Sequence, residues 1–398
     1  MVEGATNKVQ LKDSGAHNWY RFVLSFPPHL VREYLRAFNA EAGDTVLDPF
    51  CGTGTTLVEC KKLGIESVGI EAHPMTHFAS AVKVDWTPSP EGLLGHANEI
   101  AQDVRKVLEA DGIDDDRIYD PQSLFGGWNG NGLRVLPETS RKLLLKNSIS
   151  PLPLHKTLVL LDRLDRSAPG PFRGHERLAL AKALVSRIGN VRFGPEVGVG
   201  PAKPDAPVLS PWLSGVREIA EDLSELEKVD GALATAHHAD SRSTLGVLEP
   251  NSVDAVITSP PYPNEKDYTR TTRLETILLG FVKDRSELQA LKQGLVRSNT
   301  RGVYKGDDDD RWASGYPEVQ RIAEAIEARR IELGKTSGFE RLYGRVTKLY
   351  FGGMARHLAD LRRVLRPGAQ LAYVVGDQAS YLRVMIRTGQ LLGDIAES

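Results

Sequence analysis

The feature that most constrains the fold is an alternation of short apolar strands with helices along the chain. TVLD (45–48) is a buried strand that leads through the turn PFCGTGTT into a helix ending at about Leu63. ESVGIE (66–71) is a second strand, and HPMTHFASAVK begins the next helix. Strand, turn and helix at this spacing predict βαβ units, and further strands follow at 232–240, 253–259 and 369–377. The sequence therefore predicts an α/β fold with a doubly wound, mostly parallel sheet.

Two mostly helical insertions are expected to interrupt this sheet. We assign residues 17–86 and 231–398 to the core, with a helical insert at about 268–345, and residues 87–230 to a separate, mostly helical insertion. The stretch 193–207 is rich in Pro and Gly, which is typical of a linker.

Three further segments carry local signals. FPPHLVREYLRAFNAEAG predicts a helix that Pro27–Pro28 opens and Gly43 closes, and VTKLYFGGMARHLADLRRVLRPG predicts another. DDDD (307–310) lacks the spacing of a calcium loop, so we expect a solvated loop there.

Composition excludes several classes of protein. Hydrophobic residues make up 41% and charged residues 26%, as in ordinary soluble chains, and no apolar run approaches the roughly 20 residues of a membrane span. The polar N-terminus has no signal-peptide core, which favours the cytoplasm and no membrane contact. Cys51 and Cys60 alone build neither a disulfide framework nor a four-ligand zinc site. The net charge of -2 argues against a wholly basic nucleic-acid coat protein but permits a local basic patch.

Two acids stand at strand ends near a glycine turn. The turn DPFCGTGTT brings backbone close to a ligand at the carboxyl edge of a parallel sheet, although such a turn also simply joins a strand to a helix. Glu71, about 20 residues later, ends the second strand where a ribose diol is held in such folds. Its alternative role is a helix-start carboxylate. Asp240 ends the third strand and is either an acceptor for an adenine amine or an N-cap residue.

The stretch SPPY (259–262) ends the fourth core strand beside the switch point of the sheet. Its two prolines fix the carbonyls of Ser259 and Pro260, and neither proline has an N–H to compete for them. Ser259 Oγ and a main-chain carbonyl are suited to hold an amine on a planar ring while Tyr262 stacks on that ring. The alternative, a rigid exit from the strand, explains neither the serine nor the tyrosine.

In this order, VLDPFCGTGTT, VGIEAHP, HHAD, DAVITSPPY and VLRPGAQLAYVVGD resemble the S-adenosylmethionine-dependent DNA amino-methyltransferases, which modify N4 of cytosine or N6 of adenine. The resemblance covers most of 17–85 and 232–378, and HNWYRFVLSFPPHLV resembles the family's segment beside the cofactor. It implies a methyltransferase (Rossmann-like) fold, S-adenosyl-L-methionine as cofactor, no metal, and a catalytic motif formed by Ser259, Pro260, Pro261 and Tyr262. The implied cofactor-binding residues are Asp48, Pro49, Phe50, Gly52, Gly54, Thr55, Thr56, Glu71, Ala72, Asp240 and Ser241.

The resemblance also bears on the substrate. Serine at the first position of the motif is met more often with cytosine N4 than with adenine N6, so we favour N4-cytosine in double-stranded DNA, with N6-adenine as the alternative. Carbon-5 methylation needs a thiolate beside the base, whereas Cys51 and Cys60 fit small buried hydrophobes. Two alternative hypotheses are a methyltransferase that acts on RNA or on a protein amide, and a catalytically inactive relative that binds DNA.

DNA contacts are expected mainly from the basic segment 132–192, which has 12 Lys/Arg against four Asp/Glu, although a solvated helical face has the same composition. Candidate nucleic-acid-binding residues are Trp128, Asn129, Arg134, Arg141, Lys142, Arg173, Arg177, Lys266, Arg270 and Arg273. The family setting implies the prokaryotic cytoplasm or nucleoid and a cognate restriction endonuclease, and leaves monomer or homodimer open. The chain stops at GDIAES, apparently before the family's final hairpin, so we expect a shortened chain or a sheet edge completed otherwise.

Overall fold

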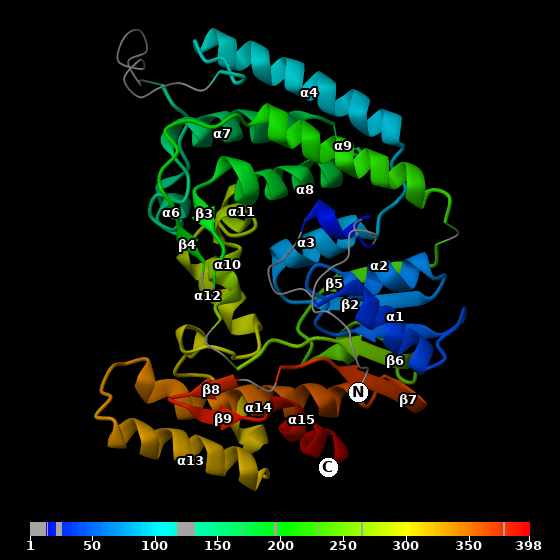
Figure 1. Ribbon diagram of the computed structural model, residues 1–398, viewed down its shortest axis with the longest axis vertical. Coiled ribbons are helices and arrows are strands. Elements are labelled where there is room, and N and C mark those ends of the chain that lie inside the picture. The colour runs from blue at the N-terminus through cyan, green and yellow to red at the C-terminus, as the bar shows by residue number, and fades with distance from the viewer. Residues whose placement is uncertain are drawn as a thin grey trace.

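The computed structural model describes residues 13, 15–20, 26–117, 132–168, 170–194, 197–229, 231–263, 266–376 and 379–398 (Figure 1). Its centre is a five-stranded sheet in the order β5-β2-β1-β6-β7. All four neighbouring pairs are parallel, which confirms the predicted α/β fold. The strands are β1 (Thr45–Asp48), β2 (Glu66–Glu71), β5 (Ala234–His238), β6 (Val253–Thr258) and β7 (Leu365–Tyr373).

Helices cover both faces of this sheet because successive residues of each buried strand point to opposite sides. On one face, Val46 and Ile257 pack with residues of α1 (Pro28–Ala37) and α2 (Thr55–Lys62). On the other face, Leu47 and Val256 pack against Leu361 of α14 (Tyr343–Leu361). The sheet is therefore doubly wound, as expected.

The first insertion forms a helical layer beyond α3 (Pro74–Lys83), as Figure 1 shows. Its long helices pack side by side around one apolar cluster that includes Leu93, Leu160 and Trp212. The described elements are α4 (Pro90–Ala110), α6 (Glu138–Arg141), α7 (Pro151–Arg166), α8 (Arg173–Ala183), a π-helical turn (Leu184–Ile188), β3 (Val191–Arg192), β4 (Gly198–Val199) and α9 (Leu209–Leu226).

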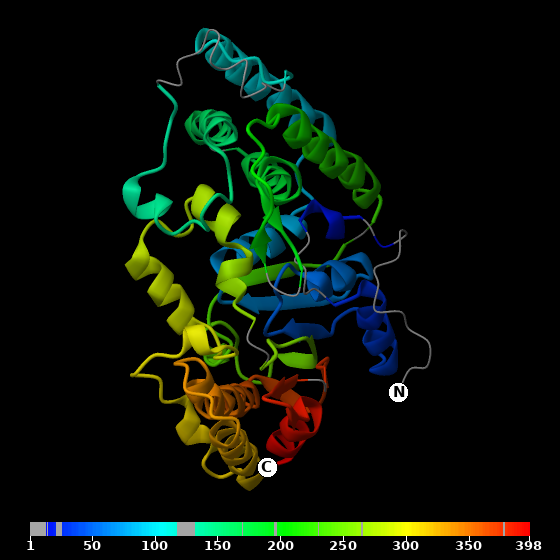
Figure 2. The ribbon, with the colours of Figure 1, turned by 60° about the vertical axis from the view of Figure 1, so that its left-hand side comes forward.

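The second insertion divides between two neighbours. Helices α10 (Tyr268–Thr271), α11 (Arg273–Leu278) and α12 (Arg285–Gly294) lie toward the first insertion, where Ser140 Oγ donates to the carbonyl of Lys283 at 2.8 Å. Helix α13 (Pro317–Glu332) instead packs with α14 around Tyr350 and Ile326. In Figure 2, α10–α12 (yellow-green to yellow) lie beside the upper helical layer, whereas α13 (golden) lies below them, near the C-terminus. Among the described residues, no helix is long and apolar enough to span a bilayer.

Several local expectations were wrong. Helix α1 ends at Ala37 rather than at Gly43, because Asn39 already adopts a left-handed φ of 52°. The stretch 193–207 is more than a linker: β4 pairs with β3, and buried Asp205 forms an ion pair with buried Lys156 at 2.9 Å. A hairpin of β8 (Ala379–Tyr381) and β9 (Val384–Ile386) follows β7 and precedes α15 (Thr388–Glu397), but it is a sheet of its own and leaves β7 at the edge.

Residues 15–20, which we call the N-terminal clasp, connect the core to both insertions. His17 Nε2 contacts Glu59 of α2 at 2.8 Å, and Trp19 Nε1 donates to Asp222 of α9 at 2.7 Å. Tyr20 donates its hydroxyl to Glu275 of α11 at 2.5 Å. Because Trp19 and Tyr20 are almost fully buried, these contacts fix how the three parts meet.

Candidate active site

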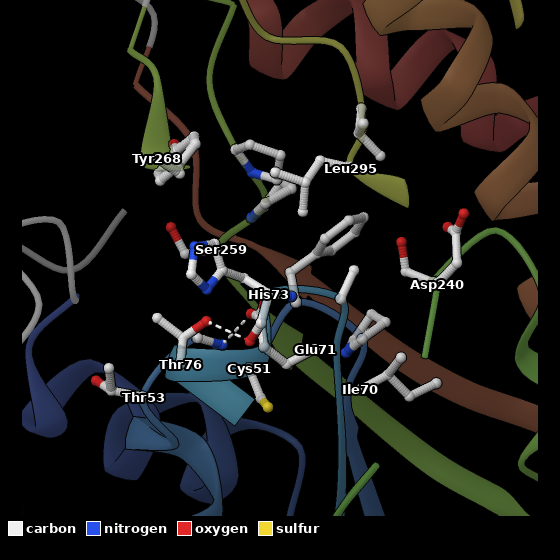
Figure 3. Close-up of a pocket in the computed structure, with 18 of the residues that line it drawn as sticks. Cys51, Thr53, Ile70, Glu71, His73, Thr76, Asp240, Ser259, Tyr268 and Leu295 are labelled. Carbon is white, nitrogen blue, oxygen red and sulfur yellow. Dashed lines mark hydrogen bonds between the residues drawn. The ribbon is translucent and has the colours of Figure 1, made fainter. Parts of the chain in front are cut away.

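A cavity opens at the carboxyl ends of β1, β2, β5 and β6, where ligands bind in open α/β sheets. It encloses about 1020 Å³ of empty space, mouth included. Figure 3 shows Glu71, Asp240 and Ser259 around it. Twelve of the predicted site residues line it: Pro49, Phe50, Gly52, Thr55, Glu71, Ala72, Asp240, Ser241, Ser259, Pro260, Pro261 and Tyr262.

The glycine turn forms one wall of the cavity. Gly52 and Gly54 have φ values of 52° and 82°, a region that favours glycine. A Cβ on Gly54 would also lie 3.0 Å from Cβ of Ser80, so glycine is required there for close packing as well. Gly54 itself is not among the lining residues and is the N-cap residue that precedes α2.

Glu71 closes the turn from the neighbouring strand. Its two carboxylate oxygens accept the backbone N–H of Gly52 at 2.9 Å and of His73 at 2.7 Å. Burial raises the pKa of Glu71 to about 7, although these hydrogen bonds oppose the shift. The Thr76 side chain also contacts this carboxylate, which has about four acceptor sites and so can still accept a ligand hydroxyl.

Asp48 and Thr56 are not among the residues that line the cavity, and their roles toward the cofactor stay a prediction. Asp48 is fully buried and accepts hydrogen bonds from Thr258 Oγ1 at 2.6 Å, Thr56 Oγ1 at 2.7 Å and Phe50 N at 3.1 Å. Burial raises its pKa to about 6. Because Thr258 precedes the SPPY corner and Thr56 follows the glycine turn, Asp48 ties the two motifs together rather than facing a ligand.

Asp240 lies across the cavity from the glycine turn, and an arginine that sequence reasoning missed holds it. Arg242 Nε contacts both oxygens of Asp240, at 2.9 and 3.1 Å, and Nη2 contacts Oδ2 at 2.6 Å. The other arm of Arg242 forms an ion pair with Asp309. The expectation that the DDDD run is a solvated loop is therefore wrong for Asp309, whose side chain is only 7% exposed.

The SPPY corner presents Ser259 in a defined orientation. Ser259 Oγ donates its one hydrogen to the carbonyl of Val374 at 3.0 Å. The hydroxyl of Tyr262, 3.1 Å away, must then be the donor in its contact with Ser259 Oγ. A serine oxygen has two lone pairs, so one remains free to accept a hydrogen bond.

Other lining residues were not predicted, and three of them are joined by hydrogen bonds. They are Phe26, Cys51, Thr53, Ile70, His73, Thr76, Tyr268, Thr272, Gly294, Leu295 and Val296. His73 accepts from Met75 N through Nδ1, so its Nε2 donates to Thr272 Oγ1 at 2.9 Å, and Thr272 Oγ1 donates to the carbonyl of Tyr268. Burial lowers the pKa of His73 to about 4, which keeps this relay neutral. Five of these residues lie in segments that the sequence analysis singled out: Phe26 in the cofactor-flanking segment, Cys51 and Thr53 in the glycine turn, and Ile70 and His73 in VGIEAHP.

The basic candidates differ in how they are engaged. Arg177 donates to the carbonyl of Leu279, and Arg273 donates to the carbonyl of Leu143, so both link the two insertions. Arg173 pairs with Asp165, and Arg134 with Asp162.

Arg141, at the end of α6, and Lys142, the next residue, are both exposed, and Lys142 pairs with Glu138. Lys266 and Arg270 follow the SPPY corner in the chain and are partly buried. Trp128 and Asn129 lie outside the described residues. DNA contact by any of these residues stays a prediction.

Comparisons with known proteins agree with this site. A family model described as DNA methylase matches residues 5–80. The chain is 27% identical to the Type II methyltransferase M.BsoBI of Geobacillus stearothermophilus over 97% of this chain and 78% of that protein. It is 24% identical to the Type II methyltransferase M.AvaI of Nostoc sp. over 97% of this chain and 79% of that protein.

A shorter match has higher identity: the chain is 42% identical to the Type II methyltransferase M.MjaII of Methanocaldococcus jannaschii over 17% of this chain and 13% of that protein. No solved structure gave a significant match. Together with the parallel sheet and the SPPY corner, these matches support a DNA amino-methyltransferase, with S-adenosyl-L-methionine as the methyl donor.

Proposed function

We propose that this DNA methyltransferase transfers the methyl group of S-adenosylmethionine to the exocyclic N4 amine of cytosine in double-stranded DNA. The observation that carries the proposal is the free acceptor on Ser259 Oγ, which lies in the same cavity as Glu71 and Asp240. Serine at the first motif position favours cytosine. Adenine N6 is the alternative, because the same corner suits either amine.

The chemistry follows from the weak nucleophilicity of a ring amine, whose lone pair is delocalised into the base. Ser259 Oγ and the Pro260 carbonyl would accept the two amine hydrogens, so that nitrogen could become tetrahedral and attack the sulfonium methyl in line. The C–N bond would form as the C–S bond breaks, S-adenosylhomocysteine would leave, and the methylated amine would lose one proton to solvent. Because the Ser259 hydrogen is committed to the Val374 carbonyl, Ser259 acts as an acceptor and not as a base. The positive charge that develops on nitrogen is stabilised by these two oxygens.

The cofactor would lie along the opposite wall. Phe50, Gly52 and Thr55 would surround its methionine end, Glu71 would accept its ribose hydroxyls, and Asp240 would accept the amine of its adenine. Cofactor and target would thus meet between the glycine turn and the SPPY corner, which Asp48 holds together.

The target base must leave the duplex to reach this cavity, which costs a few kcal/mol of stacking. The rings of Tyr262 and Tyr268 both line the cavity and would restore part of that stacking. The basic residues Arg141, Lys142, Lys266 and Arg270 remain our candidates for phosphate contacts, and a role in restriction–modification with a cognate endonuclease follows from the type of methyltransferase that the relatives are named for.

The test is transfer of labelled methyl from S-adenosylmethionine to unmethylated duplex DNA, with RNA and protein offered in parallel. We expect label in DNA alone. Ser259→Ala should lose most turnover while still binding cofactor, whereas the matched control Ser252→Ala, on the exposed amino end of β6, should be unchanged. Label only in RNA or protein would overturn the substrate class, and unchanged turnover in Ser259→Ala would remove Ser259 from the mechanism.

A further inference from the structure

Arg242 stands behind the cofactor end of the cavity and joins three separate segments. Its Nε and Nη2 grip one side of the Asp240 carboxylate, and its backbone N–H adds a hydrogen bond to Asp240 Oδ1 at 2.9 Å. Nη2 also donates to the carbonyl of Gly294 at 3.2 Å. Nη1 pairs with Asp309. The Arg242 side chain is only 7% exposed, whereas that of Asp240, which lines the cavity, is 33% exposed.

Residues 293–296, which we call the strap, cross the cavity beside Asp240. Gly294, Leu295 and Val296 line it, so the strap forms part of the cavity wall. Arg242 contacts the carbonyls of Gln293 and Gly294, at 3.5 and 3.2 Å, and these contacts connect the strap to the end of β5.

Asp309 connects Arg242 to α14, the helix that packs on the Leu47 and Val256 face of the sheet. Arg356 of α14 contacts Asp309 at 3.3 Å, so the carboxylate lies between two guanidinium groups. The backbone of Asp309 lies so close to Gly352 that a Cβ there would be 1.9 Å from the Asp309 carbonyl oxygen. The chain from α14 through Asp309 to Arg242 is therefore closely packed.

We propose that Arg242 is a positioning residue that sets the cofactor specificity of this methyltransferase by holding Asp240 and the strap in register. The inference rests on the proposed role of Asp240 as acceptor for the adenine amine. The planar guanidinium occupies one side of the carboxylate with hydrogen bonds in a fixed geometry. The acceptor capacity that Asp240 retains is thereby directed into the cavity, toward a ring amine. Replacing Arg242 by lysine would keep the positive charge but would lose the planar guanidinium that holds the carboxylate through several nitrogens.

The experiment measures binding of S-adenosylhomocysteine and of its inosine analogue, S-inosylhomocysteine, by calorimetry. The analogue has an oxygen where adenine has the amine donor. We expect wild type to prefer S-adenosylhomocysteine by at least roughly tenfold, because a site built around a donor rejects a ligand that lacks it. In Arg242→Lys the affinity for S-adenosylhomocysteine should fall roughly tenfold and the preference should shrink to about threefold or less.

The matched control is Arg366→Lys, the same substitution in an exposed fork in which Arg366 contacts both oxygens of Asp254 at the amino ends of β6 and β7. It should leave affinity and preference unchanged. If Arg242→Lys does not fold, Asp309→Asn keeps the grip on Asp240, weakens its anchor, and should reduce the preference in the same direction.

A purely structural Arg242 would lower the unfolding temperature without changing the ratio of the two affinities. Wild-type preference in a folded Arg242→Lys or Asp309→Asn protein would overturn the inference while leaving the proposed function intact. Equal binding of both ligands by wild type would overturn the role of Asp240 itself, and the inference with it.

Discussion

Replacing Asp48 by asparagine tests whether this carboxyl ties two strands together or contacts the cofactor. Asparagine has the same shape, and its carbonyl can accept from Thr258 and from the backbone N–H of Phe50, as Asp48 does. Its amide can donate to Thr56 Oγ1, whose own hydrogen then goes to the Ile257 carbonyl, already 3.2 Å away. We therefore expect Asp48→Asn to cost less than roughly 1 kcal/mol of unfolding free energy at pH 7.5.

The same variant has a pH signature of defined sign. Burial raises the folded-state pKa of Asp48 from 3.8 to about 6, so the folded protein binds its proton more tightly than the unfolded chain. The stability this contributes is fully present below the unfolded value of 3.8 and is lost as pH rises through about 6. Between pH 7.5 and pH 5, wild type should gain about 1.4 kcal/mol relative to Asp48→Asn.

Urea unfolding of both proteins at the two pH values measures this difference, and calorimetry measures cofactor binding at pH 7.5. A stability difference that does not change with pH would refute the buried, protonatable carboxyl. A large loss of cofactor affinity in a folded Asp48→Asn protein would refute its placement outside the cavity.

Three further predictions address other parts of the site. Tyr262→Phe keeps the ring but removes the hydroxyl that donates to Ser259, so methyl transfer should fall by roughly three- to tenfold. A loss as large as that of Ser259→Ala would contradict the idea that Tyr262 orients Ser259 while Ser259 holds the amine. Asp222→Ala leaves the buried indole N–H of Trp19 without its acceptor, so the free energy of urea unfolding should fall by about 1 to 3 kcal/mol, and a change within error would mean that the N-terminal clasp is not a stabilising contact. Because burial raises the pKa of Glu71 to about 7 and its proposed role requires the ionised form, cofactor affinity measured by calorimetry should fall as pH drops through 7 in wild type, but not in Glu71→Gln; parallel pH profiles would exclude Glu71 as the titrating group.

The sheet and the edge at which ligands bind could be predicted because their signals are local. Four of the five predicted strands have their apolar runs where the structure places them, and the fifth, β7, starts four residues earlier, at Leu365. Strand-end residues such as Glu71 and Ser259 follow from the strand positions, since the carboxyl ends of parallel strands meet at one edge. The glycine turn could also be predicted, because its signal is a short run of neighbouring residues.

The direction in which a side chain points could not be read this way. Asp48 ends its strand as predicted, but Thr258, which lies 210 positions away in the chain, draws its carboxylate into the interior. Four aspartates in a row resemble a solvated loop, and only tertiary contacts with Arg242 and Gly352 explain why Asp309 is buried. Tyr268 and the strap line the cavity because α10 and α12 fold back over the sheet, which no local pattern indicates.

The most direct test of the central claim is to identify the atom that receives the methyl group. A duplex in which every cytosine carries ¹⁵N at its exocyclic amine would be incubated with the protein and with S-adenosylmethionine bearing a deuterated methyl group, then digested to nucleosides for mass spectrometry. We predict deoxycytidine in which the deuterated methyl is bonded to the ¹⁵N amine. A deuterated methyl on deoxyadenosine, or on carbon 5 of cytosine, would contradict the account.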